Sequence, residues 1–267
     1  MPKLPPIESV QNGMVKHAYS LKIPKKAKET EDFLCEGFHL VQEAQQSGLR
    51  VRFIFGTAEG WATPEGTAIL EKAQPEKTKC FEVPSKIIAY VSDTVTPQGM
   101  LAVVGKIEAR YPVEPYGPVL ALHQLQDAGN LGTIFRSAEA FGVQAVFLTE
   151  GCCDPFNPKV VRSSMGSLFR VPFVQGGKWE DYQAWFKERA FQTCALSQKE
   201  SQDLLVTELS DAAAFWIGSE GAGLPDRLVQ DCRSRLRIPM VGKNESLNAA
   251  VAASLAMFWA KFGKTKN

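Results

Sequence analysis

The chain has 267 residues, of which 45% are hydrophobic and 22% are charged, and its formal net charge at pH 7 is +1. This is ordinary globular composition over a length that suits one large domain or two small ones. No apolar run approaches the roughly 20 residues of a bilayer-spanning helix, and the first residues lack the basic-then-apolar layout of a secretory signal. We therefore expect a cytoplasmic protein with no membrane contact.

A basic segment comes first along the chain, between residues 10 and 28. It contains lysines but no acidic residue, and the lysines are Lys16, Lys22, Lys25, Lys26 and Lys28. On the residues alone, two interpretations stay open. Such a run is usually a solvated surface, and it is also a pattern that binds phosphates, because lysines displace counterions from a polyanion.

The first half of the chain alternates short strands with helical sequence. We predict a helix over residues 37–48 and strands over residues 33–37, 51–57, 78–84 and 100–107. Segment 108–118 then carries three prolines and a glycine with little apolar periodicity, which is typical of an interdomain connection. We therefore expect a first α/β domain over residues 1–110 and a second domain over residues 111–267.

The second half contains apolar strands separated by helices. The predicted strands are residues 118–125, 145–149, 171–174, 191–196, 214–218 and 235–239. The predicted helices are residues 159–168, 178–190 and 246–262, together with residues 131–141, which Gly142 terminates. Near-continuous apolar strands that alternate with helices indicate a mostly parallel sheet covered on both faces.

The six cysteines and three histidines form no recognisable metal-binding pattern. No CxxC pair occurs, and Cys152 and Cys153 are too close in sequence for a relaxed disulfide. We expect reduced, inert thiols and no metal site.

Three segments of the second half depart from the plain strand and helix pattern, and each follows a predicted strand. Loops at the carboxyl ends of strands are where open α/β sheets bind ligands. In the first segment, residues 126–142, Asn130 lies near the start of a helix and Arg136 lies on it. Taken alone, a simple cap and a solvated arginine explain these two residues.

The second segment, residues 217–225, holds three glycines around Glu220. Glycines at this density favour a tight turn, and they also expose backbone N–H groups to a ligand.

The third segment, residues 238–260, leads from a loop into a helix. We expect its first turn to hold Ser246, Leu247 and Asn248, with Ser246 as a competent N-cap.

Taken together and in this order, the segments resemble the three signature motifs of the SpoU/TrmH methyltransferases of the SPOUT superfamily. The second motif matches as GSEGAGL and the third as IPMVGKNESLNAAVAAS, and the first matches at Asn130, Gly132, Arg136, Glu139, Phe141 and Gly142. The resemblance spans about residues 117–262. It implies an S-adenosylmethionine-dependent RNA 2′-O-ribose methyltransferase. The sequence departs from the family pattern in two places: the first motif reads DAGN, and His123 stands where an acidic residue is frequent. Neither departure removes a residue with a proposed catalytic role, so they bear on which RNA is the target and not on the methyl-transfer activity.

The resemblance also implies a fold and a cofactor site. The family's parallel sheet has a C-terminal segment threaded into a deep trefoil knot, against the general rule that chains do not thread loops. The cofactor is expected in a bent form, held mainly by backbone at Gly218, Ile238 and Leu247. Segment FLCEGFHLVQEA is similar to part of the smaller αβα substrate-binding domain of many members, which favours the phosphate-binding interpretation of the lysines. Family members are homodimers with active sites formed across the interface.

The resemblance assigns roles to the motif side chains. Arg136 is proposed as the base for the ribose hydroxyl, but a guanidinium stays charged at neutral pH, so positioning a phosphate and stabilising charge is the other possible role. Asn130 and Ser246 would orient Arg136 or the target phosphate. Glu220 would hold the glycine loop or the arginine, and Asn248 would fix the turn of the third motif.

The target is expected to be ribosomal RNA rather than transfer RNA, because of the added first domain. Two other classes of protein compete with this interpretation. A non-catalytic RNA-binding protein of the same fold should have lost motif residues that this chain keeps. A dinucleotide-dependent oxidoreductase would need the full GxGxxG spacing and a ribose-binding acid, which the sequence lacks.

Overall fold

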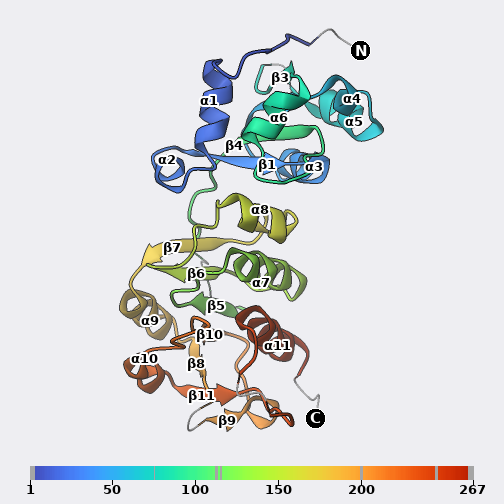
Figure 1. The fold of residues 1–267 in the computed structure, drawn as a ribbon. Coiled ribbons are helices and arrows are strands. Elements are labelled where there is room, and N and C mark those ends of the chain that lie inside the picture. Colours follow the sequence, from blue (N-terminus) through green and yellow to red (C-terminus); the bar gives the residue numbers. More distant parts are fainter. Residues whose placement is uncertain are drawn as a thin grey trace. The chain divides into compact units, whose positions relative to one another are not determined.

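The fold was obtained as a computed structural model (Figure 1), and the residues that it describes are 4–74, 76–111, 114, 116–198, 201–243 and 246–263. The chain divides into two compact units. The first comprises Met1–Glu108 and Pro155–Phe169, and the second comprises Ala109–Asp154 and Arg170–Asn267. Segment Pro155–Phe169, which the sequence places in the second domain, therefore packs with the first unit.

The first unit is built on a mixed sheet with the strand order β1-β4-β2-β3. Strand β4 is antiparallel to both β1 and β2, and β2 is parallel to β3. All four strands lie where the sequence predicts them, at β1 Asp32–Glu36, β2 Val51–Gly56, β3 Lys79–Glu82 and β4 Met100–Gly105.

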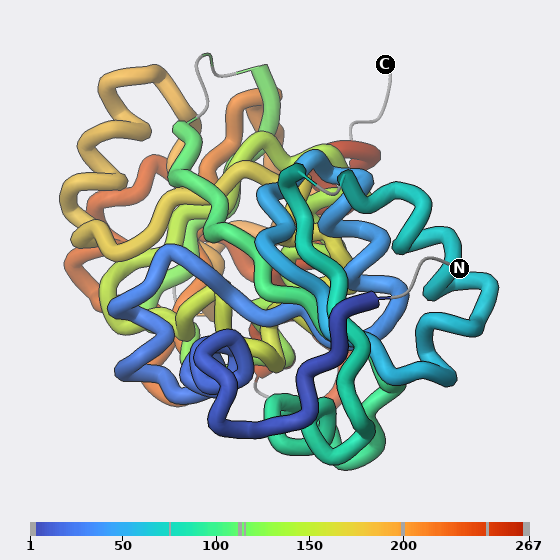
Figure 2. Tube along the Cα trace, turned by 90° about the horizontal axis from the view of Figure 1, so that it is seen from above, coloured from blue at the N-terminus to red at the C-terminus, as the bar shows by residue number. Residues whose placement is uncertain are grey.

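Helices cover both faces of this sheet. Successive strand residues point to opposite faces, so Leu34 packs in a core with residues of α1 and α6, whereas the ring of Phe33 lies 5.1 Å from that of Phe156 in the segment around α8. Helix α1 also packs beside α6, as Figures 1 and 2 show. The layering is the αβα arrangement expected from the resemblance. The helices are α1 Gly13–Ser20, α2 Pro24–Lys28, α3 Phe38–Gln46, α4 Ala58–Trp61, α5 Pro64–Lys72, α6 Ser85–Val91 and α8 Pro158–Ser164, with a 3₁₀ turn at Ser167–Phe169.

The second unit contains an entirely parallel sheet with the strand order β7-β6-β5-β10-β8-β11-β9. The prediction of a parallel sheet is confirmed. Its strands are β5 Val119–Leu122, β6 Val146–Thr149, β7 Phe173–Gly177, β8 Gln192–Leu196, β9 Gln202–Asp203, β10 Ala213–Ile217 and β11 Ser234–Arg237. The two-residue strand β9 is too short to show in the sequence pattern.

Apolar side chains hold helices against both faces of the parallel sheet. On one face, Trp216 of β10 packs with Phe186 of α9 and Leu228 of α10, and its indole nitrogen donates to Gln183 at 2.8 Å. On the other face α11 packs against α7 and β10. The helices are α7 Ala128–Ala140, α9 Trp179–Glu188, α10 Asp226–Asp231 and α11 Ala249–Phe262, with a 3₁₀ turn at Leu204–Val206.

None of the helices within the described ranges is long and apolar enough to cross a membrane.

All six cysteines are free thiols, and burial raises the pKa of Cys194 and Cys232 to about 12. These thiols are therefore protonated at neutral pH and unreactive. The trefoil knot stays a prediction of the resemblance.

Candidate active site

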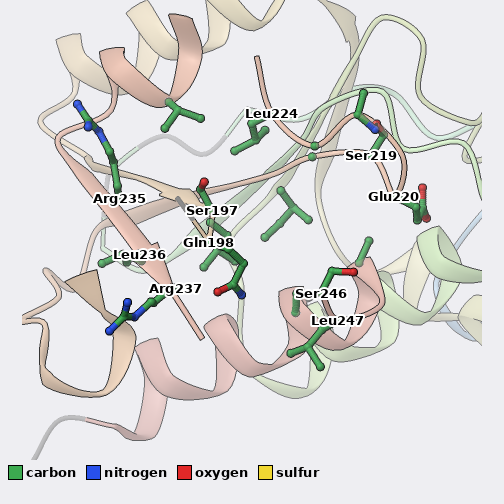
Figure 3. A pocket seen from close by; sticks show the side chains of 18 of the residues that line it. Ser197, Gln198, Ser219, Glu220, Leu224, Arg235, Leu236, Arg237, Ser246 and Leu247 are labelled. Atoms are coloured by element: carbon green, nitrogen blue, oxygen red, sulfur yellow. The ribbon is translucent and has the colours of Figure 1, made fainter. Parts of the chain in front are cut away.

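A cavity of about 1100 Å³ opens in the second unit at the carboxyl ends of β8, β10 and β11. Residues that directly follow these strands line it: Ser197 after β8, Gly218 after β10 and Ile238 after β11. Figure 3 shows the labelled lining residues around the cavity. The location is the one that parallel sheets generally use for ligands, because strand ends and loop backbones meet there.

The glycine loop after β10 forms one wall of the cavity. The backbone of Gly223 returns to Ser219, to which its N–H donates at 3.0 Å, and Gly223 has φ +67°. A Cβ atom on Gly218 would lie 2.5 Å from the backbone nitrogen of Leu224 and still closer to the carbonyl of Gly223. The chain can make this turn only with glycine at position 218. A side chain there would push the returning loop out of its place in the cavity wall.

The lining combines apolar groups with side chains of both charges. Leu224, Ile238 and Leu247 supply apolar surface, while Glu220 and Asp226 supply carboxylates. In Figure 3, the side chains of Arg235 and Arg237 lie on the side of the cavity opposite Ser219 and Glu220. A ligand that carries a flat ring and groups of both charges, such as S-adenosylmethionine with its adenine, sulfonium and carboxylate, fits this lining.

The three cofactor residues predicted from the third and second motifs, Gly218, Ile238 and Leu247, all line this cavity, as do Glu220 and Ser246. The cavity lining does not include Asn130, Arg136 or Asn248. Sequence reasoning missed Gln198, Asp226 and Arg237, because they lie outside the motifs and only the packing of the strands brings them to the cavity.

A chain of hydrogen bonds joins the three motif segments. The side-chain amide nitrogen of Asn130 donates to Oε1 of Glu220 at 2.5 Å, and the side-chain amide nitrogen of Asn248 donates to the side-chain oxygen Oδ1 of Asn130 at 2.9 Å. Asn130 is thus the central member, with one bond to the glycine loop and one to the start of α11. Asn130 is 90 positions from Glu220 and 118 positions from Asn248 in the sequence, yet the three side chains form one polar cluster.

The start of α11 differs from the prediction. The helix begins at Ala249, and its N-cap is Asn248, whose side-chain oxygen accepts from the N–H groups of Ala250 at 2.9 Å and Val251 at 3.2 Å. The prediction that Ser246 caps the helix is wrong: Ser246 and Leu247 lie in the preceding loop, on the cavity wall. Asn248 is the better cap here because its amide nitrogen also reaches Asn130.

Arg136 lies on the outer surface of α7. Its side chain is exposed, and among the described residues it makes no hydrogen bond or ion pair, whereas Glu139 on the same helix pairs with Arg170. Helix α7 itself is capped by Asp127, which accepts from the backbone of Asn130 at 2.7 Å, and it ends with Gly142 at φ +67°, as predicted. A permanently charged guanidinium without a carboxylate partner is available for an anionic substrate.

The five lysines of the basic segment do not behave alike in the first unit. Lys16 on α1 and Lys25, Lys26 and Lys28 on α2 are exposed. Lys22 is half-buried, and its ammonium group donates to the carbonyl of Ser92 at 2.7 Å and to that of Tyr90 at 3.3 Å. Lys22 therefore fastens the chain before α2 to the end of α6, while the other four remain available to solvent.

His123, the departure from the family pattern, is buried at the end of β5. Its ring nitrogen Nδ1 lies 3.4 Å from the hydroxyl of Thr149. Burial lowers the pKa of His123, partly offset by the carboxylate of Glu180, so the ring is neutral at neutral pH. The ring therefore contacts Thr149 at the end of β6 and adds no charge to the candidate site.

Comparison with known proteins covers both units of the chain. Residues 117–258 match the SpoU rRNA Methylase family, and residues 12–102 match the MRM3-like substrate binding domain. The 23S rRNA (guanosine(2553)-2'-O)-methyltransferase RlmP of Bacillus subtilis is 32% identical over 252 residues, covering 94% of this chain and 97% of that protein.

Solved structures agree with the sequence comparison. The AdoMet-bound rRNA methyltransferase from Sinorhizobium meliloti is 29% identical with a TM-score of 0.85, covering 96% of this chain and 97% of that one. An RNA 2'-O ribose methyltransferase is 26% identical with a TM-score of 0.81, covering 95% and 97%. The motifs, the parallel sheet and these matches agree, and the chain belongs to the SpoU rRNA Methylase family.

Proposed function

We propose that this protein methylates the 2′-hydroxyl of a specific ribose in ribosomal RNA, with S-adenosylmethionine as the methyl donor. The observation that carries the proposal is the hydrogen-bonded chain Glu220–Asn130–Asn248, which joins the cavity to the helix that presents Arg136. The similarity to RlmP, which by its name methylates a guanosine of 23S rRNA at the 2′-oxygen, supports the choice of substrate.

Bound S-adenosylmethionine supplies a methyl group carried by a sulfonium. The glycine loop and the backbone at Ile238 and Leu247 are proposed to hold it, and the carboxylate of Glu220 lies at the edge of the same cavity. Because Glu220 accepts a hydrogen bond from Asn130, the glycine loop is held at a fixed distance from α7. Such positioning of two reactants lowers the barrier to an in-line transfer.

Arg136 is proposed to bind the phosphate next to the target ribose and to stabilise the negative charge that develops on the 2′-oxygen. Its guanidinium stays charged at neutral pH, so charge stabilisation is the role that its chemistry favours over proton abstraction. The hydroxyl proton then passes to the RNA phosphate or to solvent. Ser246, on the cavity wall, is proposed to help orient this phosphate.

The first unit is proposed to bind the RNA. The four exposed lysines Lys16, Lys25, Lys26 and Lys28 supply the charge, and the match to a substrate binding domain supports the role. Lys22 contributes to the structure of this region instead. Ribosomal RNA as the target, rather than transfer RNA, and a cytoplasmic location remain predictions.

A homodimer through the second unit is part of the proposal. Exposed apolar residues recur along one face of α11, at Val251, Leu255, Phe258 and Phe262, each 41–58% exposed. The ring of Phe141 contacts both Phe258 and Phe262, which widens the face. An exposed apolar stripe of this kind typically marks a protein interface. Light scattering should give the mass of a dimer for the wild type and that of a monomer for Phe258→Asp.

The activity is tested by incubating the purified protein with methyl-labelled S-adenosylmethionine and ribosomal RNA, followed by digestion to nucleosides. The label should appear in a 2′-O-methylated nucleoside and should be absent with Arg136→Ala. Label in a methylated base would contradict the proposed reaction. Binding of S-adenosylhomocysteine without any transfer to RNA would favour a non-catalytic RNA-binding protein.

A further inference from the structure

Two adjoining hollows lie in the first unit on either side of the loop that joins α6 to β4. One has a volume of about 390 Å³ and is lined by residues that include Phe38 and Glu59. The other has a volume of about 300 Å³ and is lined by residues that include Leu40 and Met165. Ile88, Pro97 and Gln98 line both, so the hollows share a wall.

The floor of the two hollows is apolar and suits flat rings. Phe38, half-buried at the start of α3, lines the first hollow. Leu40, Ile88 and Met100, all buried, form the base of the second. Volumes near 300 Å³ are at the small end of ligand sites, which suits single aromatic rings better than a large cofactor.

The polar groups on the rim are those that recognise base edges. Gln98 is exposed and, within the part of the chain that the structure describes, its amide has no hydrogen-bond partner, so it offers both donor and acceptor. Glu59 adds an exposed carboxylate to the first hollow. A carboxylate accepts hydrogen bonds from the amino and imino groups of bases but repels phosphate.

The arginine that lines the second hollow, Arg162, is already paired with carboxylates. Arg162 donates to Asp93 at 2.9 Å and to Glu36 at 3.5 Å. Glu36 is itself held by the hydroxyl of Ser92 at 2.6 Å and the N–H of Asp93 at 2.8 Å. The described lining therefore offers a phosphate no lysine and no unpaired arginine, and the hollows fit bases with the phosphates kept outside.

We propose that the two hollows bind two neighbouring nucleobases of a single-stranded RNA segment, with Phe38 stacking on one base and Gln98 hydrogen-bonding at the shared wall. This inference rests on the proposed RNA-modifying function and names the part of the substrate that the first unit reads. Bases in a duplex are stacked and paired, so only an unpaired segment can place them in such hollows. Met165 and Arg162 come from the segment around α8, which therefore contributes to the recognition of the RNA.

The full-length protein is tested by fluorescence anisotropy with a labelled, unstructured single-stranded RNA and with the same strand in a duplex. The variants are Phe38→Ala, Gln98→Ala and Ala89→Trp; Ala89 is exposed on α6 and lines the first hollow, so a tryptophan there fills it. The matched control is Val95→Trp, because Val95 is 99% exposed on the same loop and is not among the residues lining either hollow. Calorimetry with S-adenosylhomocysteine and a thermal melt confirm that each variant is folded.

Each of the three variants should weaken single-strand binding by about fivefold or more, the loss typical of one stacked base. The control should bind at least as tightly as the wild type, and the duplex should bind more weakly and without sensitivity to Gln98→Ala. Single-strand affinity within twofold of the wild type for both Gln98→Ala and Ala89→Trp would overturn the inference, as would an equal loss in Val95→Trp. If these variants lose RNA binding while the wild type never methylates ribosomal RNA, the proposed function fails and the RNA site stands.

Discussion

The glycine loop between Gly218 and Gly223 allows a graded test of the cofactor site. A methyl group at 218 would lie 2.5 Å from the backbone nitrogen of Leu224, so the loop must shift by about 1 Å to restore van der Waals distance. At Gly221 an added Cβ meets nothing within 4 Å, and the backbone there is not left-handed. At Gly223 there is also space, but φ is +67°, a conformation that strains any residue with a side chain.

The expected effects follow from these differences. Overpacking of this kind costs about 1–3 kcal/mol, and because residues 220–223 are exposed, the loop can move without unfolding the domain. The cost should therefore appear in ligand binding: Gly218→Ala should weaken S-adenosylhomocysteine by roughly 5- to 150-fold. Gly223→Ala should weaken it by about tenfold, from the roughly 1–2 kcal/mol of a left-handed residue. Gly221→Ala should bind like the wild type.

Isothermal titration calorimetry measures these affinities, and thermal melts show whether each variant is folded. The result that the loop geometry predicts is weakened binding in both Gly218→Ala and Gly223→Ala, with wild-type affinity in Gly221→Ala. Wild-type affinity in Gly218→Ala, or equal losses in Gly218→Ala and Gly221→Ala, would refute the reasoning that the turn at 218 shapes the cofactor wall.

Three further predictions concern Asn248, Asn130 and His123. Asn248→Ala removes the cap of α11 and should lower the free energy of unfolding by about 1 kcal/mol in urea titrations. Asn248→Asp keeps the cap but loses the hydrogen-bond donor to Asn130. It should therefore have the unfolding free energy of the wild type but not its methylation activity. Asn130→Asp places a carboxylate beside Glu220 and should reduce methylation at least tenfold while leaving a folded protein, which a methyl-transfer assay checks. Burial lowers the pKa of His123 below 6.5 in the folded protein. Just below that pH the unfolded chain therefore binds more protons than the folded one, so the free energy of unfolding falls as the pH is lowered. His123→Gln should lose this part of the acid sensitivity, and an unchanged pH dependence in urea titrations would contradict the assignment.

Most strands could be predicted from the sequence because their apolar runs are bounded by turn residues. Two short helices, α3 and α8, were also predicted. The helices that were not predicted have only four to nine residues, which give little periodicity: α1, α2, α4, α5, α6 and α10. Local signals for two of them were present: Thr57 and Thr63 accept hydrogen bonds from the N–H groups of Gly60 and Gly66 at 3.0 Å, as N-caps of α4 and α5. The packing of α8 on the first unit left no such signal, because it depends on contacts distant in sequence, such as Arg162 with Asp93.

The motifs identified the loops that build the site, but tertiary contacts decided how each residue is used. Ser246 and Asn248 are both good caps in isolation, and the bond to Asn130 selects Asn248. Lys22 cannot be told from its neighbours in the sequence, yet only it reaches the carbonyl of Ser92. Gln98 was not among the predicted site residues. It stands out only because the fold places it between two hollows.

The most direct test of the proposed function maps 2′-O-methylated riboses in total RNA from cells with and without this protein. The proposal predicts that a ribose of ribosomal RNA loses its methyl group when the protein is absent. The mark should return with the wild-type protein and not with Arg136→Ala. An unchanged set of 2′-O-methylations, or a lost mark that lies on a base, would contradict it.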